Sequence, residues 1–158
     1  MTVATLFLTC GLQGAGKTTL AKRLEAERPA LRLTSDEWLH ELYSGLTAEE
    51  LEPFRGTVEQ LQWSVTVRAL ELGCDVVLDW GLWSRRGRDE LRTEAQALGA
   101  RVVLCLLDPS RDELWDRLSR RNATLPAGTF HITEAALDRA IGLFEHPTAD
   151  EFALFDPP

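Results

Sequence analysis

The sequence feature that most constrains the fold is a G-x-x-x-x-G-K-T motif at residues 11–18. This is the Walker A pattern, in which a glycine-rich loop wraps around the phosphates of a nucleotide. The glycines let the main chain approach a ligand closely, and the N–H groups at the start of the next helix converge on phosphate oxygens. In this arrangement Lys17 bridges the β- and γ-phosphates, and the Thr18 hydroxyl binds Mg²⁺.

The segments on either side of the motif favour a genuine phosphate-binding loop. Residues 5–9 form a short apolar and β-branched run, which predicts a buried strand. In the segment that follows the motif, residues 19–26, Leu20 and Leu24 lie four positions apart on one face of a predicted helix. We therefore predict that the loop binds ATP, through Gly11, Gln13, Gly14, Ala15, Gly16, Lys17, Thr18 and Thr19.

The remainder of the chain alternates between predicted strands and helices. Further strands are expected at residues 31–34, 76–79 and 101–108, and a fifth at 151–155. Two helices begin with capping boxes, Thr47 with Glu50 and Ser110 with Glu113. The helix after the first of these is expected to bury an apolar face made of Val58, Leu61, Val65, Ala69 and Leu72. The alternation predicts one α/β domain over residues 1–158, a parallel sheet covered by helices on both faces.

Two acidic residues lie at predicted strand ends, the edge at which such sheets bind ligands. Asp79 ends an apolar strand and is a candidate to hold the metal or a metal-bound water; a turn or helix-capping acid is the alternative. Asp36 follows the second strand and is a candidate general base for a substrate hydroxyl. It can equally be the N-cap of a helix at Trp38, and Glu37 is a second candidate for the base.

Basic residues are concentrated at two helix ends. Arg117, Arg120 and Arg121 precede a loop at residues 122–131 that contains Pro126 and Gly128, and mobile arginines often stabilise charge during phosphoryl transfer. Each of the three can also be an ordinary solvated arginine. A second group at positions 85, 86 and 88 crowds a helix start, where cations are unfavourable, and so suggests an anionic partner.

The composition limits the kinds of partner and the compartment that fit this chain. A net charge of −8 disfavours a long nucleic acid, which usually requires a basic face. There is no apolar run of the roughly 20 residues that a membrane span needs and no signal-peptide pattern, so we expect a cytoplasmic protein. The three cysteines lack the spacing of a metal site. Cys10 and Cys105 lie in or beside predicted core strands, which favours buried thiols in a reducing compartment.

The chain resembles the small P-loop kinases grouped as AAA-type ATP-binding proteins or predicted kinases, which are relatives of chloramphenicol phosphotransferase, zeta toxin and polynucleotide kinase. The resemblance spans nearly the whole chain and rests on residues 11–18, 34–38, 77–79, 84–88, 117–122 and 126–130. It implies a nucleoside-kinase-like P-loop NTPase fold with five parallel strands in the order 2-3-1-4-5. It also implies a general base at Asp36 and a lid that carries the arginines of residues 117–121.

These observations predict an ATP-dependent kinase that transfers the γ-phosphate to a hydroxyl of a small molecule. Catalysis is assigned to Lys17, Asp36, Arg117, Arg120 and Arg121, and Mg²⁺ binding to Thr18 and Asp79. A polynucleotide 5′-hydroxyl kinase is one alternative, which the charge disfavours. Trp80 and Trp83 also count against it, because polynucleotide kinases often carry small polar residues there. The other alternative is a non-enzymatic nucleotide-binding switch that hydrolyses ATP slowly.

Overall fold

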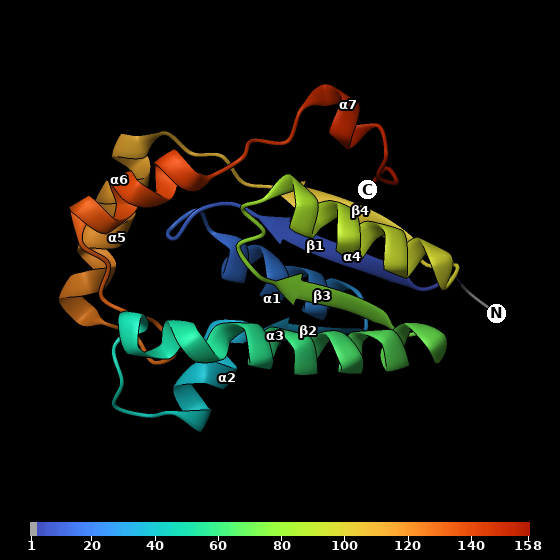
Figure 1. Cartoon of the computed structure of the whole chain (residues 1–158), viewed down its shortest axis with the longest axis horizontal. Coiled ribbons are helices and arrows are strands. Elements are labelled where there is room, and N and C mark those ends of the chain that lie inside the picture. Colours follow the sequence, from blue (N-terminus) through green and yellow to red (C-terminus); the bar gives the residue numbers. More distant parts are fainter. Residues whose placement is uncertain (1–2) are drawn as a thin grey trace.

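The computed structural model describes residues 3–158 and has a parallel sheet at its centre (Figure 1). Within those residues the sheet has four strands, in the order β2-β3-β1-β4. Each lies close to its predicted position: β1 at Thr5–Cys10, β2 at Ala30–Thr34, β3 at Asp75–Asp79 and β4 at Arg101–Leu106. The predicted order is therefore confirmed for these four strands.

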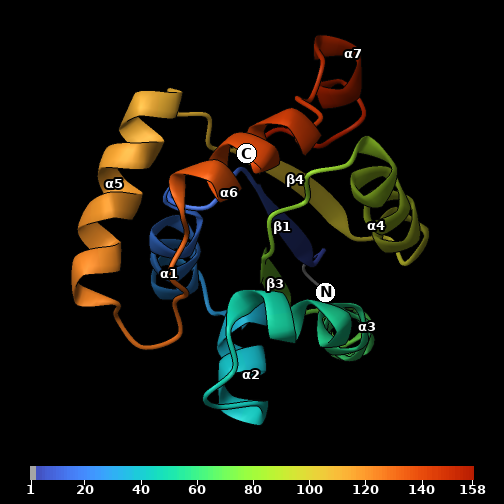
Figure 2. The ribbon, with the colours of Figure 1, turned by 60° about the vertical axis from the view of Figure 1, so that its left-hand side comes forward.

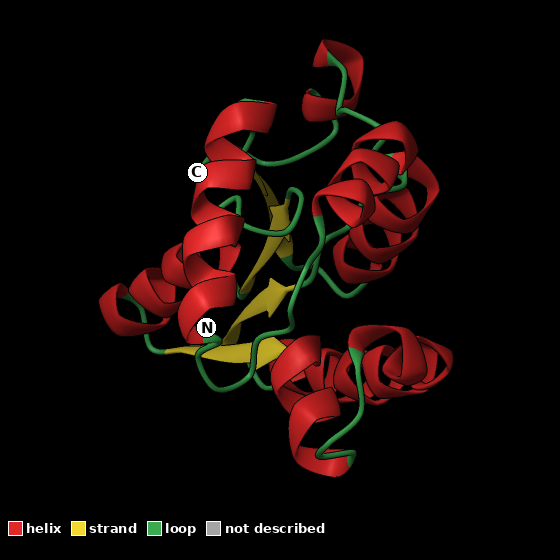
Figure 3. Ribbon diagram, turned by 90° about the vertical axis from the view of Figure 1, so that its left-hand side faces the viewer, coloured by secondary structure: helices red, strands yellow, loops and turns green. Residues whose placement is uncertain are grey.

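Helices cover both faces of the sheet, as predicted, so the fold has three layers (Figure 3). Figure 2 shows α1 and α5 on one side of the sheet and α3 and α4 on the other. The helices are α1 at Lys17–Glu27, α2 at Ser35–Leu42, α3 at Ala48–Glu71, α4 at Arg85–Ala97, α5 at Arg111–Thr124, α6 at Glu134–Leu143 and α7 at Ala149–Phe152. Among residues 3–158, no helix is both long and apolar enough to cross a bilayer.

The core follows from the alternation of side chains along the buried strands. In β1, Phe7 belongs to a cluster with Ala21 of α1, whereas Leu6 and Leu8 belong to the larger cluster on the opposite face. Because both faces of a parallel sheet are covered, its strands consist of nearly continuous apolar residues. All six residues of β1 are buried.

Helix α3 buries part of its predicted apolar face. The capping box of Thr47 and Glu50 is present, and Val58 and Ala69 are buried as predicted, but Leu61, Val65 and Leu72 are exposed. Gln62 and Thr66 are buried in their place. The reason is a polar contact that a hydrophobic pattern does not reveal: the side-chain oxygen of Gln62 accepts a 2.7 Å hydrogen bond from the indole N–H of buried Trp80.

The predicted fifth strand at residues 151–155 is wrong. The segment forms the short helix α7, which Thr148 caps. Glu151 is held there by a buried ion pair with Arg88 of α4. The edge of β4 is instead covered by Asp156, whose N–H donates to the carbonyl of Val102 over 2.8 Å and whose carboxylate accepts from the Val102 N–H over 2.7 Å.

Candidate active site

A large cleft of about 1330 Å³ lies at the carboxyl ends of the strands. The strand arrows in Figure 1 point toward this edge of the sheet, where α5 and α6 also lie. The walls come from the glycine loop between β1 and α1, the ends of β2 and β3, the first turns of α3 and α4, α5, and the loop that follows α5. All the predicted nucleotide contacts except Gly11, which lies at the base of the loop, line this cleft.

The glycine loop is built from backbone geometry that side chains would disturb. A Cβ atom at Gly11 would lie 2.6 Å from the carbonyl oxygen of Leu107, so that position has no room for one. Gly14 and Gly16 have φ angles of 81° and 97°, in the left-handed region that favours glycine. The loop can therefore present its main chain to a ligand.

Lys17 and the start of α1 provide the positive charge of the loop. Within residues 3–158 no side chain caps the N-terminus of α1, and its first turn has no acidic residue, so its N–H groups suit a phosphate. The Lys17 ammonium donates to the carbonyl of Leu12 over 2.7 Å. Burial lowers the pKa of Lys17, and the carboxylates of Asp79 and Asp36 oppose that effect.

Asp79 and Thr18, the two predicted metal ligands, are in direct contact. The Thr18 hydroxyl donates to Oδ2 of Asp79 over 2.6 Å, and the Thr34 hydroxyl donates to the same oxygen over 3.0 Å. Burial raises the pKa of Asp79, while hydrogen bonds from both threonines counter the shift. Carboxylate and hydroxyl oxygens are ligands that Mg²⁺ accepts, so the donor set fits that ion.

Thr34 was missed by the sequence analysis, although a signal existed. In the register of the parallel strands, Thr34 of β2 lies beside Asp79 of β3. A hydroxyl at the last residue of one strand can therefore reach an acid at the last residue of its neighbour. The strand order, which the sequence analysis took from a family resemblance, was needed to recognise the pair.

Asp36 lies in the first turn of α2, and Thr34 rather than Asp36 occupies the N-cap position. Its Oδ1 accepts a hydrogen bond from Arg55 of α3 over 2.8 Å, a contact that the sequence analysis did not identify. Glu37, the second candidate for the base, is paired with Arg32 over 2.9 Å. Asp36 therefore lies in the cleft with one carboxylate oxygen engaged.

The three candidate arginines are not equivalent. Arg117 lies across the glycine loop, with its guanidinium 3.4 Å from the carbonyl oxygen of Gly14 and 3.3 Å from that of Ala15. Arg121 also lines the cleft, and burial lowers its pKa, an effect that Asp36 opposes. Arg120 is outside the cleft lining, pairs with Asp116 over 2.9 Å and has a side chain that is 78% exposed.

The loop after α5 forms part of the cleft wall. Helix α5 continues to Thr124, so Asn122, which was expected in the loop, lies in the helix. From there its side chain exchanges two hydrogen bonds with the backbone of Ile132, of 2.7 and 3.0 Å. Phe130 packs against a cluster formed by Leu39, Leu51 and Val58 of α2 and α3. The loop therefore extends from α5 across to α2.

Acidic and aromatic side chains also line the cleft. Trp80 and Trp83 are among them, and the indole N–H of Trp83 donates to the carbonyl of Gly11 in the glycine loop over 3.3 Å, whereas Trp38 packs into the core. The acidic side chains of this wall, in addition to Asp36, are Glu37, Glu52, Glu59 and Glu90. Lys17, Lys22, Arg117 and Arg121 surround the phosphate end. The cleft therefore has a cationic end and a largely acidic end.

Comparisons with known proteins agree with this fold. A family model described as an AAA domain matches residues 6–147. Among curated proteins, no sequence matches the chain. The solved structures similar to it include the Pnkp1/Rnl/Hen1 RNA repair complex, with a TM-score of 0.73 and 18% identity over 99% of this chain and 47% of that one.

Two other solved structures resemble the chain over most of both lengths. Kti12 of Chaetomium thermophilum in complex with ADP-AlF3 has a TM-score of 0.66 and 16% identity, over 90% of this chain and 81% of that one. A gluconokinase from Sinorhizobium meliloti has a TM-score of 0.61 and 20% identity, over 95% and 80%. At such identities the likeness shows that the chain shares their fold, and it leaves the substrate open.

Proposed function

The chain belongs to the AAA domain family, and from that premise we propose that it is a kinase that transfers the γ-phosphate of ATP to a hydroxyl of a small molecule. The observation that carries the proposal is the arrangement of one cleft. Lys17, Thr18 and Asp79 lie at its phosphate end, and Asp36 lies in the same cleft, unpaired with any of them. A site that only hydrolysed ATP would have no need for a separate acceptor wall.

The phosphate end would bind ATP through the loop backbone and Lys17. The Lys17 ammonium would exchange its bond to the Leu12 carbonyl for the β- and γ-phosphates. Thr18 and Asp79 would hold Mg²⁺, which neutralises phosphate charge when bound. Arg117 and Arg121 would add positive charge around the group being transferred, where such arginines are most effective.

Asp36 would act on the acceptor. As the acceptor oxygen forms its bond to the γ-phosphorus, the bond from that phosphorus to the β–γ bridging oxygen breaks and ADP leaves. The hydroxyl proton passes to the carboxylate of Asp36. The loop between α5 and α6 would exclude water over this reaction, because water that reached the γ-phosphate would compete with the acceptor.

The charge of the acceptor wall supports a small neutral or cationic acceptor over a polynucleotide. Four carboxylates in addition to that of Asp36, those of Glu37, Glu52, Glu59 and Glu90, line this wall, with Arg55 as its basic residue. Anionic acceptors would meet repulsion there, since like charges within a few ångströms disfavour binding. The partly exposed indole of Trp83 suits an apolar part of the same small molecule.

The test is a coupled assay of ADP release with panels of neutral, cationic and anionic hydroxyl compounds, RNA 5′ ends among the anionic ones. We expect neutral or cationic acceptors to stimulate ADP release well above the rate without acceptor. Stimulation by RNA 5′ ends would favour the polynucleotide kinase. A low rate that no compound changes would favour the nucleotide-binding switch.

A further inference from the structure

Arg55 occupies a distinctive position in the acceptor wall. It projects from α3 to the first turn of α2, where its Nη1 lies 2.8 Å from Oδ1 of Asp36 and 3.4 Å from the hydroxyl of Ser35. Its Nε donates to Glu52 over 3.0 Å. The guanidinium is thereby held by two carboxylates through two different nitrogens, which fixes the plane of the group.

Packing between α2 and α3 does not depend on this ion pair. The two helices are joined by a buried cluster of Leu39, Leu51 and Val58. The side chains of Arg55 and Asp36 are 26% and 45% exposed, and pairs so accessible contribute only about 0–1 kcal/mol to stability. A role in stability therefore gives little reason for an arginine to point into the cleft.

The charge of Arg55 is already balanced within the wall. Asp36 and Glu52 both contact it, and it opposes the rise in the pKa of Glu59 that burial produces. Two of the three guanidinium nitrogens of Arg55 are directed at carboxylates, Nη1 at Asp36 and Nε at Glu52, which leaves Nη2 as the nitrogen that an acceptor could reach.

We propose that Arg55 is a positioning residue that fixes the orientation of Asp36, an inference that rests on the proposed kinase function. By binding Oδ1, Arg55 leaves Oδ2 as the oxygen available to the acceptor hydroxyl. The rotation of Asp36 is thereby restricted before the acceptor arrives. Misplacement of a catalytic group by about 1 Å can lower the rate by about 10²-fold, so the orientation has kinetic value.

The kinetic test uses Arg55→Ala, Arg55→Lys, Asp36→Asn and the Arg55→Ala/Asp36→Asn double variant. We expect Arg55→Ala to lower kcat by about 10²-fold while the KM values for acceptor and ATP stay near those of the wild type. Arg55→Lys should recover part of the rate, since an ammonium keeps the charge but not the planar fork. In the Asp36→Asn background, Arg55→Ala should cause no further loss.

A matched control is Arg68→Ala, on the same helix. Arg68 makes an ion pair with Glu71 three positions away, as Arg55 does with Glu52, but its side chain is 77% exposed and outside the cleft. This variant should keep the wild-type kcat. A rise in acceptor KM at unchanged kcat in Arg55→Ala would overturn the proposal and make Arg55 an acceptor-binding residue, and so would additive losses in the double variant.

A second measurement needs no acceptor and separates this proposal from the proposed function. In nitrogen NMR spectra of the free protein, the paired Arg55 guanidinium should rotate slowly about its Nε–Cζ bond, and Asp36→Asn should accelerate that rotation. Unchanged rotation would overturn the proposal whatever the enzyme does. Slow rotation in a protein that no acceptor stimulates would contradict the kinase function while leaving the pair itself established.

Discussion

The Thr18 hydroxyl donates to Oδ2 of Asp79 over 2.6 Å and so joins two motifs that lie 61 residues apart in the chain. Thr34 donates to the same oxygen, so one buried carboxylate connects the glycine loop, β2 and β3. In the free protein, hydroxyl groups satisfy this carboxylate. A cation placed between Thr18 and Asp79 would stabilise the charge that burial now makes unfavourable.

The first prediction concerns the cost of keeping Asp79 ionised. Burial raises its pKa above the ordinary 3.8, so the folded protein binds the proton more tightly than the unfolded chain. The ionised carboxylate of Asp79 therefore lowers the free energy of unfolding at pH values above its raised pKa. This loss of stability disappears below pH 3.8, where the group is protonated in both states. Asp79→Asn should raise the melting temperature of the free protein at neutral pH, and the difference should vanish as the pH falls through that window.

The same variant should weaken the use of Mg²⁺. ADP release by Asp79→Asn should need a higher Mg²⁺ concentration for half-maximal rate, and added Mg²⁺ should partly restore it. Asp75→Asn is a control at the other end of β3, remote from the cleft lining. An unchanged Mg²⁺ dependence in Asp79→Asn would remove Asp79 from the metal site.

The second prediction separates catalysis at Asp36 from nucleotide binding. Asp36→Asn removes the charge that a general base at this position would need to accept the proton, and general bases typically contribute about 10²–10⁴-fold. Acceptor phosphorylation should therefore fall by that order, while calorimetry should find ATP affinity near that of the wild type. A loss of ATP affinity would instead make Asp36 a ligand of the nucleotide or metal site, with Glu37 as the next candidate for the base.

The third prediction ranks the arginines of α5. Arg117 and Arg121 line the cleft, whereas Arg120 is paired with Asp116 outside it. Alanine at position 117 or 121 should cause at least one severe loss of kcat, of the order of 10³–10⁵-fold seen for arginines that contact transferring phosphate. Arg120→Ala is the internal control and should lower kcat only slightly. Small losses of kcat in all three variants would show that these residues are ordinary surface arginines.

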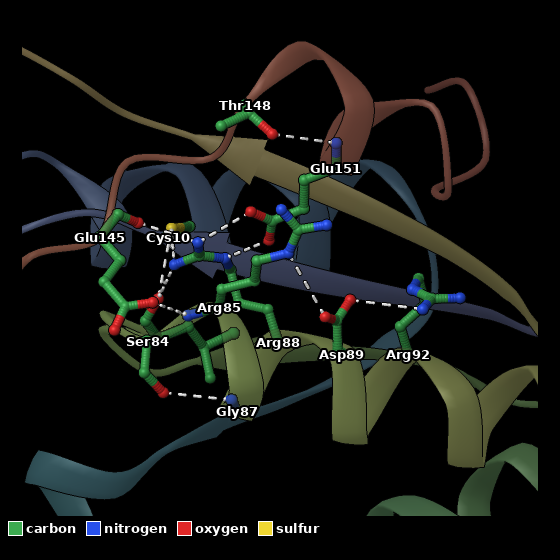
Figure 4. A network of polar contacts seen from close by, with 11 residues as sticks. Cys10, Ser84, Arg85, Gly87, Arg88, Asp89, Arg92, Glu145, Thr148 and Glu151 are labelled. Carbon is green, nitrogen blue, oxygen red and sulfur yellow. Dashed lines mark hydrogen bonds and ion pairs between the residues drawn. The ribbon is translucent and has the colours of Figure 1, made fainter.

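The fourth prediction concerns the ion pair that replaces the expected fifth strand (Figure 4). The side chains of Arg88 and Glu151 are 0% and 1% exposed, and Arg88 also donates to the carbonyls of Leu82 and Glu145. Arg88→Met leaves the Glu151 carboxylate buried without its partner, which should destabilise the fold by about 3–5 kcal/mol in urea unfolding.

Glu151→Gln removes the carboxylate of the same pair and leaves Arg88 as the buried charge. Arg88→Met/Glu151→Leu removes both charges. The double variant should recover much of the stability, since paired apolar replacements are often tolerated. If Arg88→Met unfolds at the same urea concentration as the wild type, the pair does not hold α7 to α4.

The parts of the fold that the sequence predicted are those determined by local patterns. The strands around Phe7 and Val77 are short apolar runs, and the capping boxes of α3 and α5 are local side-chain contacts. The glycine loop is recognisable because its spacing is fixed by phosphate geometry. These features need no knowledge of what packs against them.

The parts that the sequence could not predict depend on contacts between distant residues. Arg88 suggested an anionic partner, but only the fold identifies it as Glu151, 63 residues away. The indole N–H of Trp80 donates to buried Gln62 on α3, and this contact places Leu61 on the exposed face of the helix. Arg55 gives no local signal at all, because its contact with Asp36 forms only when α3 lies beside α2.

The measurement that tests the central proposal most directly follows the γ-phosphate itself. ATP labelled at the γ-phosphate is incubated with the protein, Mg²⁺ and the acceptor panel, and the label is partitioned between inorganic phosphate and phosphorylated acceptor. We predict that the wild type places the label on the hydroxyl of a small neutral or cationic compound and that Lys17→Ala, folded as judged by circular dichroism, transfers none. Label found only in inorganic phosphate with every acceptor, or transfer that survives Lys17→Ala, would contradict the proposed kinase.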